Sequence, residues 1–549
     1  MSEKYTAAYE IDELIKSEKT HESVEEEATE ILSKKLHEYS LNELKNELVL
    51  PTERENLDID VQEKLSPEEM EKNFQKFIEI LKQDIKLDFI KDLIKQFPKS
   101  KVYLVGGAVR DGFMGRQIKD YDMVLSGIQG DDLEKALSEM GRVDLVGKNF
   151  GVYKFKNKEN KEYLDLVLPR QEKSGGSGAK HDFEIESNWQ LPIKQDLARR
   201  DFTINAMALD FDGYKLVDPF GGKEDLTNGI VRSVGNPEKR LSEDLSRILR
   251  GIRFAVKMNY QIDNDTWQAI KIKSQEILKI DNKGKLIVPW ETISTELEKT
   301  FIIDPAKTFN LLNESGLMKQ IFPELEKLKG LKQPQEHHKE GDAFVHTKLA
   351  LKALPLNSPI SLIFATLMHD VGKLETFKQD ENGKITFYGH AEKSTEITKN
   401  ICKRLKLKTK LTNKITNIIA NHMKIFQIGN MTDATIYKLL FETMPEDETS
   451  HELIRLNRAD LLASLSEEKA SYEIARRKIS EFNKKAAEKQ LEIKPLINGK
   501  DLISLGLKPG PIFNKIINLI RDRQLGGDIK SKEEAIALTL LLIKELINI

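Results

Sequence analysis

Asp120 and Asp122 stand two residues apart at the start of a short β-rich run, Tyr121–Leu125. In an extended strand, alternate side chains project from one face, so both carboxylates would point the same way. Two carboxylates this close repel each other unless cations lie between them, and hard oxygen ligands suit Mg²⁺. Two metal ions held there would activate an attacking hydroxyl and neutralise the charge on a triphosphate and its leaving group. A D-x-D pair exposed on an edge strand is the frequent alternative.

Two other features indicate phosphate chemistry in the same region. An apolar run leads into Gly106 and Gly107 and then into a helix start. Paired glycines let backbone amides approach a phosphate, and a helix N-terminus favours an anion, although such turns are also common for packing reasons. Asp165 is a candidate third carboxylate that would deprotonate the attacking hydroxyl, with Tyr163 and Val167 as the other inward positions of its strand.

A second group of candidates lies downstream, where seven of the ten histidines fall between residues 337 and 451. An ordered H…HD…D series in segments of helical patterning consists of His346, His369, Asp370 and Asp460. Imidazole and carboxylate together suit a transition metal better than Mg²⁺ alone, and a metal bound there would activate water to attack a phosphate ester.

Other histidines lie close to this series. His390 and His422 offer two further ligands, which would extend the site to two metals. A lone histidine such as His422 is more often a polar core or surface residue than a ligand. The adjacent pair His337-His338 falls outside the series and is interpreted as surface.

The hydrophobic pattern predicts the elements that must position these residues. Ser66, Pro67 and Glu69 form a helix-start signature of a capping serine, a first-position proline and a capping-box glutamate. Apolar residues then recur at helical spacing as far as Phe97, which predicts one long amphipathic helix or two helices in series. Short β-rich runs follow, namely Val102–Val105, Tyr121–Leu125, Gly151–Phe155, Tyr163–Leu168 and Ala206–Asp210.

The remaining pattern is simpler. A glycine and serine segment, residues 174–178, interrupts the β-rich runs with the composition of a mobile loop. After about Ser242 the chain is predominantly helical to its end. Residues 1–65 lack glycine and show broken helical periodicity, which predicts loosely packed helices or partial disorder.

Length and composition bound the class of protein. At 549 residues and 62.8 kDa the chain is too long for one hydrophobic core, so several domains are expected. Its longest apolar runs, such as residues 535–543, fall short of the ~20 residues needed to cross a bilayer. Cys402 is the only cysteine, which rules out an intramolecular disulfide and fits a reducing cytoplasm. We therefore expect a soluble cytoplasmic protein with no membrane span.

The net charge of −3 hides an uneven distribution. Residues 1–60 carry 17 acidic and 7 basic side chains, a balance of −10, so residues 61–549 carry +7. The densest basic stretch, residues 393–424, suits contact with a phosphate backbone and equally suits the solvated face of a helix.

In their order, these motifs resemble those of the tRNA CCA-adding enzyme and bacterial poly(A) polymerase family of class II nucleotidyltransferases. The likeness is carried by Leu104–Asp111 with Gly115–Arg116 and Lys119–Asp122, by Leu168–Lys173, by Arg199–Ala206, by Asp218–Gly222 with Asp225–Leu226, and by Glu243–Ala255. The histidine series resembles the HD phosphohydrolase superfamily through Gly341–Thr347 and Leu367–Lys373. Two departures remove no ligand: Tyr121 replaces a usual aliphatic residue, and Ser246 stands where a more apolar one is common.

The resemblance implies a role for each motif. The aspartates would bind Mg²⁺, and the incoming nucleotide would be contacted by Gly107, Arg110, Arg170, Arg200, Asp201 and Asn205. On the helix of the last motif, Asp244, Arg247 and Arg250 would select the base. An aspartate accepts from an exocyclic amine while an arginine donates to a ring acceptor, so side chains can stand in for a template base. Cytosine and adenine fit such a template, whereas guanine and uracil present a carbonyl where the aspartate needs a donor.

We therefore expect an α+β protein, with a small polymerase beta-like nucleotidyltransferase α/β head followed by a long all-α body that contains an HD domain. The expected segments are an N-terminal extension (1–65), the head with its leading helix (66–235), a helical neck for nucleotide selection and RNA binding (236–330), the HD domain (331–465) and a helical, tRNA-binding tail (466–549).

The implied function is addition of CCA to tRNA 3′ ends from CTP and ATP by a two-metal mechanism. It needs Mg²⁺ in the head, and a transition metal is expected in the HD site. Addition of poly(A), of CC or of A alone stays open as an alternative, as does the choice between an active HD site and an inert support. An HD phosphohydrolase with an RNA-binding head is the alternative from another class, and the intact aspartates argue against it. The sequence leaves the oligomeric state open.

Overall fold

The computed structural model describes residues 65–118, 121–146, 151–157, 163–174, 183–334, 338, 341–432, 435–436, 439, 447–464, 477–478, 496–507, 509–526, 529 and 531–547. The chain divides into two compact units, Met1–Gln62 and Glu63–Ile549, and all described residues belong to the second. The N-terminal extension, Asp120, His337 and most of the predicted glycine and serine loop lie outside the described residues.

Two helices in series open the described chain, as one of the two predicted forms. Helix α3 (Pro67–Gln83) begins at the predicted capping box, in which Ser66 Oγ accepts from the Glu69 N–H at 3.2 Å and the Glu69 carboxylate accepts from the Ser66 N–H at 2.8 Å. It ends at Asp84, and the short 3₁₀ turn η2 (Ile85–Leu87) leads into α4 (Asp88–Gln96). Both helices bury an apolar face in the core of the head.

A seven-stranded mixed sheet forms the centre of the head, in the order β3-β4-β5-β2-β1-β8-β9. Within it, β2 and β5 run parallel, and the other neighbouring strands are antiparallel. The strands are β1 (Lys101–Val105), β2 (Asp122–Ser126), β3 (Gly141–Leu145), β4 (Val152–Asn157), β5 (Leu164–Val167), β8 (Ala208–Asp210) and β9 (Lys215–Val217).

Five of these strands were predicted, and β3 and β9 were not. The run Ala206–Asp210 is only partly strand, because the 3₁₀ turn η4 (Thr203–Asn205) brings the chain up to Ala206. A separate hairpin, β6 (Arg170–Ser174) with β7 (Phe183–Ser187), flanks the segment predicted as a loop. This hairpin was not predicted: β6 is polar throughout, and the alternation of Phe183 and Ile185 with polar residues in β7 is too short to have been recognised.

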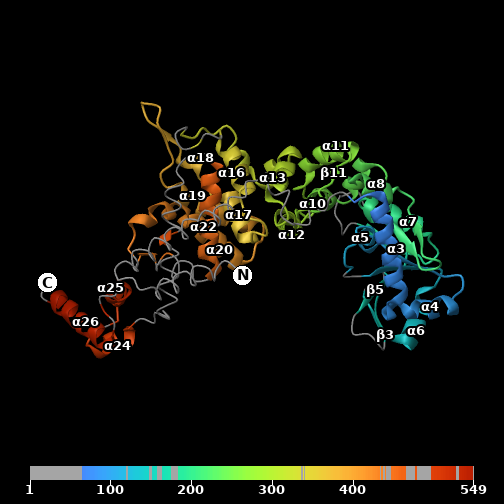
Figure 1. The fold of residues 1–549 in the computed structure, drawn as a ribbon, viewed down its shortest axis with the longest axis horizontal. Coiled ribbons are helices and arrows are strands. Elements are labelled where there is room, and N and C mark those ends of the chain that lie inside the picture. Colours follow the sequence, from blue (N-terminus) through green and yellow to red (C-terminus); the bar gives the residue numbers. More distant parts are fainter. Residues whose placement is uncertain are drawn as a thin grey trace, which may run out of the picture. The chain divides into compact units, whose positions relative to one another are not determined.

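The helices of the head surround the sheet (Figure 1). Helix α3 packs against α5, and α6 packs against β3 and β4. In chain order the helices of the head after α4 are α5 (Gly107–Phe113), α6 (Gly130–Met140), α7 (Ile193–Ala198) and α8 (Gly222–Asn228); α9 (Pro237–Glu243) and α10 (Ser246–Lys257) come next and open the neck. A two-stranded parallel pair, β10 (Ile230–Val231) with β11 (Gln261–Ile262), adjoins α10.

The predicted helical body follows, but it is not all-α, because residues 378–379 and 385–386 pair as a short antiparallel hairpin. Its neck also contains α11 (Asn264–Lys273), η5 (Ser274–Glu276), α12 (Trp290–Phe301), α13 (Pro305–Glu314), α14 (Leu317–Ile321) and α15 (Pro323–Glu326). The next segment contains α16 (Ala343–Lys352), α17 (Ile360–Met368), α18 (Lys373–Thr376), the hairpin β12 (Lys378–Gln379) and β13 (Ile385–Thr386), α19 (His390–Arg404), α20 (Thr409–Asn421), η6 (His422–Asn430) and α22 (Asp447–Ala463). One continuous apolar cluster runs through both parts, from Leu241 to Ala459.

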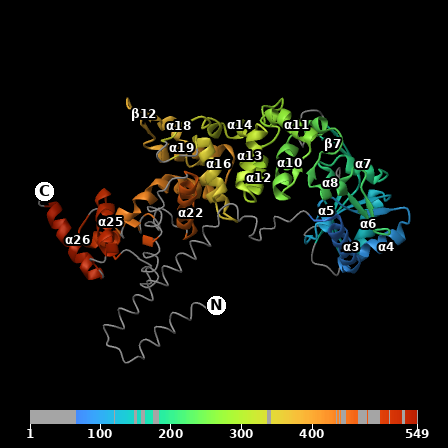
Figure 2. The ribbon, with the colours of Figure 1, turned by 45° about the horizontal axis from the view of Figure 1, so that its top comes forward.

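Helices α16, α17, α20 and α22 pack side by side, and α19 packs on α20. Figure 1 labels all five helices, and α16, α19 and α22 can be followed again in Figure 2. The chain therefore brings segments that are a hundred residues apart in sequence to one place. The tail has a small core of its own, built from α24 (Gly499–Ser504), α25 (Pro511–Gly526) and α26 (Lys532–Ile547). Among the described residues, no helix is long and apolar enough to span a membrane.

Candidate functional site

Two carboxylates meet on neighbouring strands of the head. Asp122 is the first residue of β2 and is exposed, and its register partner on the parallel strand β5 is Asp165. Side chains of residues paired in register point to the same side of a sheet, so these two carboxylates share a face. The Lys154 ammonium lies 3.1 Å from the Asp165 carboxylate. Asp120, the partner of Asp122 in the predicted metal pair, lies outside the described residues.

One detail of the strand prediction is wrong. Tyr163, Asp165 and Val167 were expected to face inward, but Leu164 and Leu166 are the buried positions and Tyr163 is 42% exposed. The face that carries Asp165 is therefore the more open one. This suits a carboxylate that must reach a substrate better than a core position would.

The glycine turn between β1 and α5 lies beside this pair of strands. Gly106 has a φ of 72°, and a Cβ on it would stand 2.6 Å from the Arg200 guanidinium. Gly107 begins α5, and a Cβ on it would meet only Arg110, at 3.5 Å. The first glycine is thus required by the fold of the turn, whereas the second leaves space above the helix N-terminus.

A buried polar network lines the same part of the head. Arg110 Nη1 donates to Asn205 Oδ1 at 2.5 Å, and Asn205 Nδ2 donates to Asp201 Oδ1 at 3.2 Å. On the other side, Arg250 Nε donates to Asp201 Oδ2 at 2.9 Å. Burial raises the pKa of Asp201, but Arg250 and Asn205 outweigh that effect and hold this pKa below its usual range. Four of the predicted nucleotide-binding residues are therefore joined in one charged chain.

Asp196 is a member of this site that the sequence analysis missed. It is fully buried on α7, where Oδ1 accepts from Arg199 Nη2 at 2.8 Å and Oδ2 accepts from Arg200 Nη2 at 3.4 Å. Its spacing of three and four residues from the two arginines was the available signal, because such pairs share a helix face. Asp196 holds Arg200 over the glycine turn.

The predicted base-reading residues lie where α9 passes into α10. Asp244 Oδ1 accepts from the Ser246 N–H at 2.9 Å and from the Ser246 hydroxyl at 2.6 Å. Arg247 Nη1 donates to the Arg240 carbonyl at 2.7 Å, and its Nη2 donates to the Arg199 carbonyl at 3.1 Å. Asp244 and Arg247 are both buried. Arg170, the remaining predicted nucleotide contact, is the first residue of β6 and pairs in register with Ser187.

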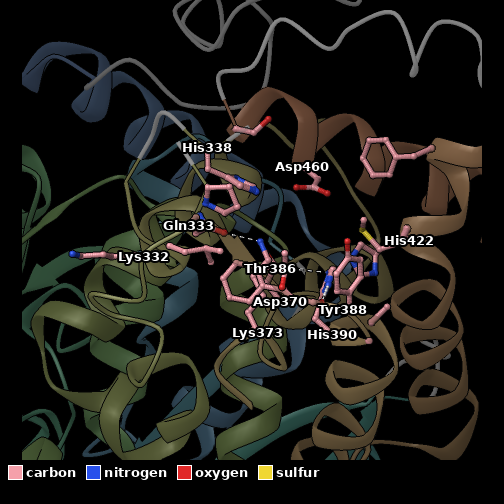
Figure 3. Close-up of a pocket in the computed structure, with 18 of the residues that line it drawn as sticks. Lys332, Gln333, His338, Asp370, Lys373, Thr386, Tyr388, His390, His422 and Asp460 are labelled. Carbon is pink, nitrogen blue, oxygen red and sulfur yellow. Dashed lines mark hydrogen bonds and ion pairs between the residues drawn. The ribbon is translucent and has the colours of Figure 1, made fainter. Parts of the chain in front are cut away.

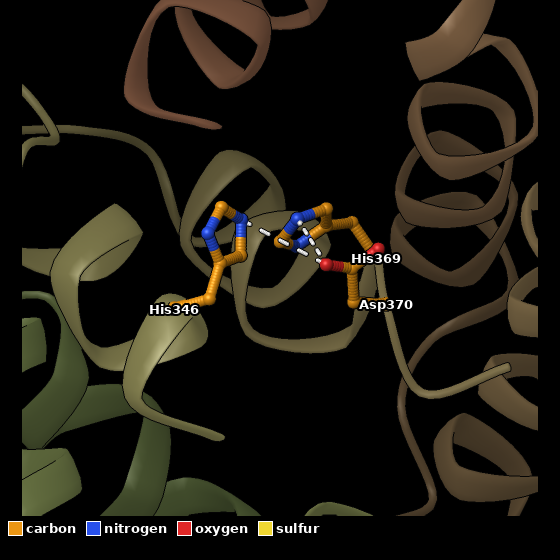
Figure 4. A group of neighbouring side chains, drawn as sticks. All are labelled: His346, His369 and Asp370. Atoms are coloured by element: carbon orange, nitrogen blue, oxygen red, sulfur yellow. Dashed lines mark ion pairs between the residues drawn. The ribbon is translucent and has the colours of Figure 1, made fainter. Parts of the chain in front are cut away.

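The four residues of the histidine series converge in the body, although Asp460 is 114 positions after His346. His346 lies on α16, His369 and Asp370 follow α17, and Asp460 lies on α22. His346 Nε2 is 2.8 Å from Asp460 Oδ1. Figure 4 shows the other three side chains, in which His369 Nε2 is 3.2 Å from Asp370 Oδ2. His346, His369 and Asp370 form a group whose ligand atoms all lie within 4.8 Å of one another.

His390 and His422 complete a second group that shares Asp370. Asp370 Oδ1 is 3.6 Å from His390 Nε2, which in turn is 3.2 Å from His422 Nε2. In His369, His390 and His422, Nδ1 faces a backbone carbonyl oxygen at 2.8, 2.9 and 2.6 Å, respectively. In the neutral form of each ring, a proton on Nδ1 leaves the Nε2 lone pair directed into the cluster, the arrangement usual for metal-binding histidines.

The protonation of this cluster also fits a cation site. Burial lowers the pKa of His369, but Asp370 and Asp460 outweigh it and raise that pKa to about 10. Burial lowers the pKa of His422 to about 3, so this imidazole is neutral. His369 Nε2 and Asp370 Oδ2 are buried but make no hydrogen bond of good geometry among the described residues. The two carboxylates thus favour a cation, and the donor set fits a divalent metal.

A cavity of about 2300 Å³ opens onto this cluster (Figure 3). Lys373 lines it, with Nζ 2.8 Å from Asp370 Oδ2 and 2.6 Å from the Gln333 side-chain oxygen. His338 lines it too, and its ring centroid lies 5.1 Å from that of His346. The interpretation of His338 as a surface residue is therefore wrong. The position of His338 in the sequence, outside the ordered series, did not reveal its place beside the cluster.

Family models match the two regions of the chain that contain these sites. A family model described as the Poly A polymerase head domain matches residues 102–232, and one described as the HD domain matches residues 343–465. The multifunctional CCA protein of Nitrosococcus oceani is 34% identical over 344 residues, which cover 62% of this chain and 79% of that protein. The multifunctional CCA protein of Alkalilimnicola ehrlichii is 32% identical over 345 residues, or 62% of this chain and 78% of that protein.

Solved structures share the fold. The CCA-adding enzyme of Bacillus stearothermophilus in complex with CTP has a TM-score of 0.57 at 22% identity, covering 87% of this chain and 99% of that one. The Thermotoga maritima CCA-adding enzyme complexed with tRNA has a TM-score of 0.51 at 21% identity, covering 88% of this chain and 97% of that one. At this identity, the likeness is one of fold.

Proposed function

Because the chain belongs to the family of the multifunctional CCA proteins, a class II nucleotidyltransferase family, we propose that it adds CCA to the 3′ ends of tRNA from CTP and ATP. The observation that carries this proposal is that several of the predicted groups come together at one place in the head. There, Asp122 and Asp165 share a face beside the Gly106-Gly107 turn and the buried network of Asp201. Nucleotide transfer needs these three components together: carboxylates, a phosphate cradle and fixed cations.

Both domains belong to classes that generally use divalent metals. In the head, Asp120 and Asp122 would hold Mg²⁺, which supplies charge neutralisation at the triphosphate and activation of the attacking hydroxyl. Asp165 accepts the proton of the terminal RNA hydroxyl, since it faces the same side of the sheet as Asp122. Arg110, Arg200 and Asn205 orient the nucleotide from the far side of the glycine turn. Arg170, on β6, contacts it from the hairpin.

Asp244, Arg247 and Arg250 take the place of a template. The exocyclic amine of cytosine or adenine donates to the Asp244 carboxylate, and a ring nitrogen or carbonyl accepts from Arg247. Guanine and uracil offer a carbonyl oxygen to the carboxylate and are repelled. Ser246 already holds Asp244, and two backbone carbonyls already hold Arg247. These side chains therefore lose little conformational entropy when the nucleotide binds.

The HD domain is proposed to be a metal-dependent phosphohydrolase, because all its candidate ligands meet at one cavity. His346, His369, Asp370 and Asp460 would hold a transition metal, which activates a water for attack on a phosphate ester. Lys373 lies beside the ligands and would neutralise the phosphate. His390 and His422 are positioned for a second metal that shares Asp370.

The proposed roles of the other segments follow the domain order predicted above. The neck supports nucleotide selection and RNA binding, and the three-helix tail binds tRNA. Five lysines of the basic stretch are exposed on and between α19 and α20, and they are candidates for contact with a phosphate backbone: Lys399, Lys403, Lys406, Lys408 and Lys410. Arg404 and Lys414 are used otherwise, in ion pairs with Glu324 and Glu452.

The direct test offers the purified protein and Mg²⁺ three tRNAs that end in the discriminator base, in C or in CC. CTP and ATP are supplied singly and together. We expect the tRNA that ends in the discriminator base to gain two cytidines and one adenosine, the one that ends in C to gain one of each, and the one that ends in CC to gain adenosine alone, with no further extension. Addition of A alone to every end would identify a poly(A) polymerase, and arrest after CC or a requirement for a CC end would identify the partial enzymes.

The two glycines of the turn are expected to respond differently to alanine. Gly106→Ala forces a side chain into the left-handed region and against Arg200, so it should lower the free energy of unfolding by about 1–3 kcal/mol. Gly107→Ala meets nothing closer than 3.5 Å and should fold normally. Its methyl group would block the close approach of a phosphate, so the KM for CTP should rise about tenfold. Denaturant unfolding and steady-state kinetics measure the two effects, and an unchanged KM in Gly107→Ala would contradict the phosphate cradle.

A further inference from the structure

The Asp244 carboxylate has two oxygens with different surroundings. Oδ1 accepts two hydrogen bonds from Ser246, one from the backbone N–H at 2.9 Å and one from the hydroxyl at 2.6 Å. Over the described part of the chain, no hydrogen bond or ion pair reaches Oδ2. Ser246 therefore occupies one oxygen and leaves the other to a ligand.

The rest of this corner is fixed as well. Asp244 has extended backbone between α9 and α10, and among the buried carboxylates of the described residues it is the one for which no ion pair is found. Arg247 is anchored through Nη1 and Nη2 by the carbonyls of Arg240 and Arg199, and Nη1 is also 3.2 Å from the Glu243 carboxylate. The least restricted degree of freedom at this site is therefore rotation of the Asp244 carboxylate about Cβ–Cγ, because this torsion has only broad preferences.

We propose that the Ser246 hydroxyl is a specificity-determining positioning group, which fixes the Asp244 carboxylate so that Oδ2 meets the amine of the incoming base. This inference rests on the proposed function, in which Asp244 reads the base. An oxygen held in one direction accepts well from the amine of cytosine or adenine. It equally repels the carbonyl of uracil or guanine, because a fixed acceptor cannot turn away from a second acceptor.

The Ser246 hydroxyl sets the direction of the Asp244 carboxylate and is not needed to begin helix α10. The Ser246 N–H bond to Oδ1 is a backbone interaction, so it persists when the side chain is replaced. Ser246 is buried at the first position of α10 and touches neither the glycine turn nor the carboxylates of the sheet in any hydrogen bond of the described residues. Its removal should therefore alter the choice of base and leave phosphate chemistry unchanged.

The test compares single-nucleotide addition by the full-length protein for CTP against UTP, on tRNA that ends in the discriminator base. Ser246→Ala should reduce the ratio of kcat/KM for CTP over UTP about tenfold, the worth of one well-placed hydrogen bond. The matched pair Ser246→Thr and Ser246→Val has nearly one shape and differs in the hydroxyl. Thr should retain the parent ratio, and Val should behave like Ala.

Asp244→Asn separates this inference from the function on which it rests. If Asp244→Asn leaves the CTP preference intact, Asp244 does not read the base and the proposed template fails. If Asp244→Asn removes the preference while Ala and Val at position 246 keep it, the template stands and the role of Ser246 is overturned. A uniform loss of kcat for both nucleotides in the Ala and Val variants, with a lowered unfolding temperature, also overturns it, because that is the effect of a structural residue.

Discussion

Asp122→Ala is expected to lower the rate of nucleotide addition at least about 1000-fold, because a carboxylate ligand that neutralises triphosphate charge contributes several kcal/mol to the transition state. The change should not harm the fold, since Asp122 is exposed at the first position of β2 and makes none of the contacts of the apolar core. Single-turnover addition of CTP to tRNA, with Mg²⁺ varied, measures the loss. Asp120→Ala should have an equal effect if the two aspartates hold metal together.

Two controls make this result specific. Asp132→Ala removes an exposed carboxylate from the first turn of α6, in the same domain but away from β2, and should leave the rate unchanged. Asp122→Asn keeps the shape of the side chain while removing its charge, and it should be nearly as slow as the alanine variant. Retention of more than a tenth of the parental rate by Asp122→Ala would refute the metal assignment.

Asp370→Ala is expected to remove both metal binding and phosphohydrolase activity from the HD site. Asp370 is the one residue shared by the two groups of potential ligands found among the described residues. Hydrolysis of a 2′,3′-cyclic phosphate, in which one water opens the ring to a 2′- or 3′-phosphate monoester, should fall at least about 1000-fold, the scale of charge stabilisation by a metal. The metal retained by the purified protein, measured by mass spectrometry, should fall in parallel. His369→Ala should lose the same activity, because its Nε2 faces the same carboxylate.

The head provides the internal control for this experiment. Addition of CCA by Asp370→Ala should stay near the parental rate, since the residues proposed for addition lie on other elements. Asp370→Asn preserves the volume of the buried side chain and keeps the result interpretable if the alanine variant unfolds. Glu381→Ala, in the exposed turn between β12 and β13, should change neither activity nor metal content. If the parent protein binds no metal and does not hydrolyse the cyclic phosphate, the HD domain is a structural support.

The sequence by itself determined the local features of this protein. The Ser66 capping box, five strands of the head sheet, the helical body and the order of the motifs all depend on residues near one another in the chain. Caps are set by neighbours three positions apart, and strand alternation is set by neighbours two apart. The capping box predicted from three residues is present in the structure. The roles of these residues came from the resemblance to a known family, because spacing alone does not distinguish a metal-binding D-x-D pair from an exposed pair on an edge strand.

Only the tertiary structure decided which of these residues meet. The register of β2 against β5 places Asp165 beside Asp122, and the return of α22 places Asp460 2.8 Å from His346. The same packing brought His338, which was not predicted as a site residue, into the HD cavity. The contact of Ser246 with Asp244, which was not predicted either, is local, because the two residues are two positions apart. Strand register and helix packing are set by the burial of apolar faces over the whole domain. The pattern of residues along the chain shows which face of each helix or strand is apolar, but it does not show which other element packs against that face.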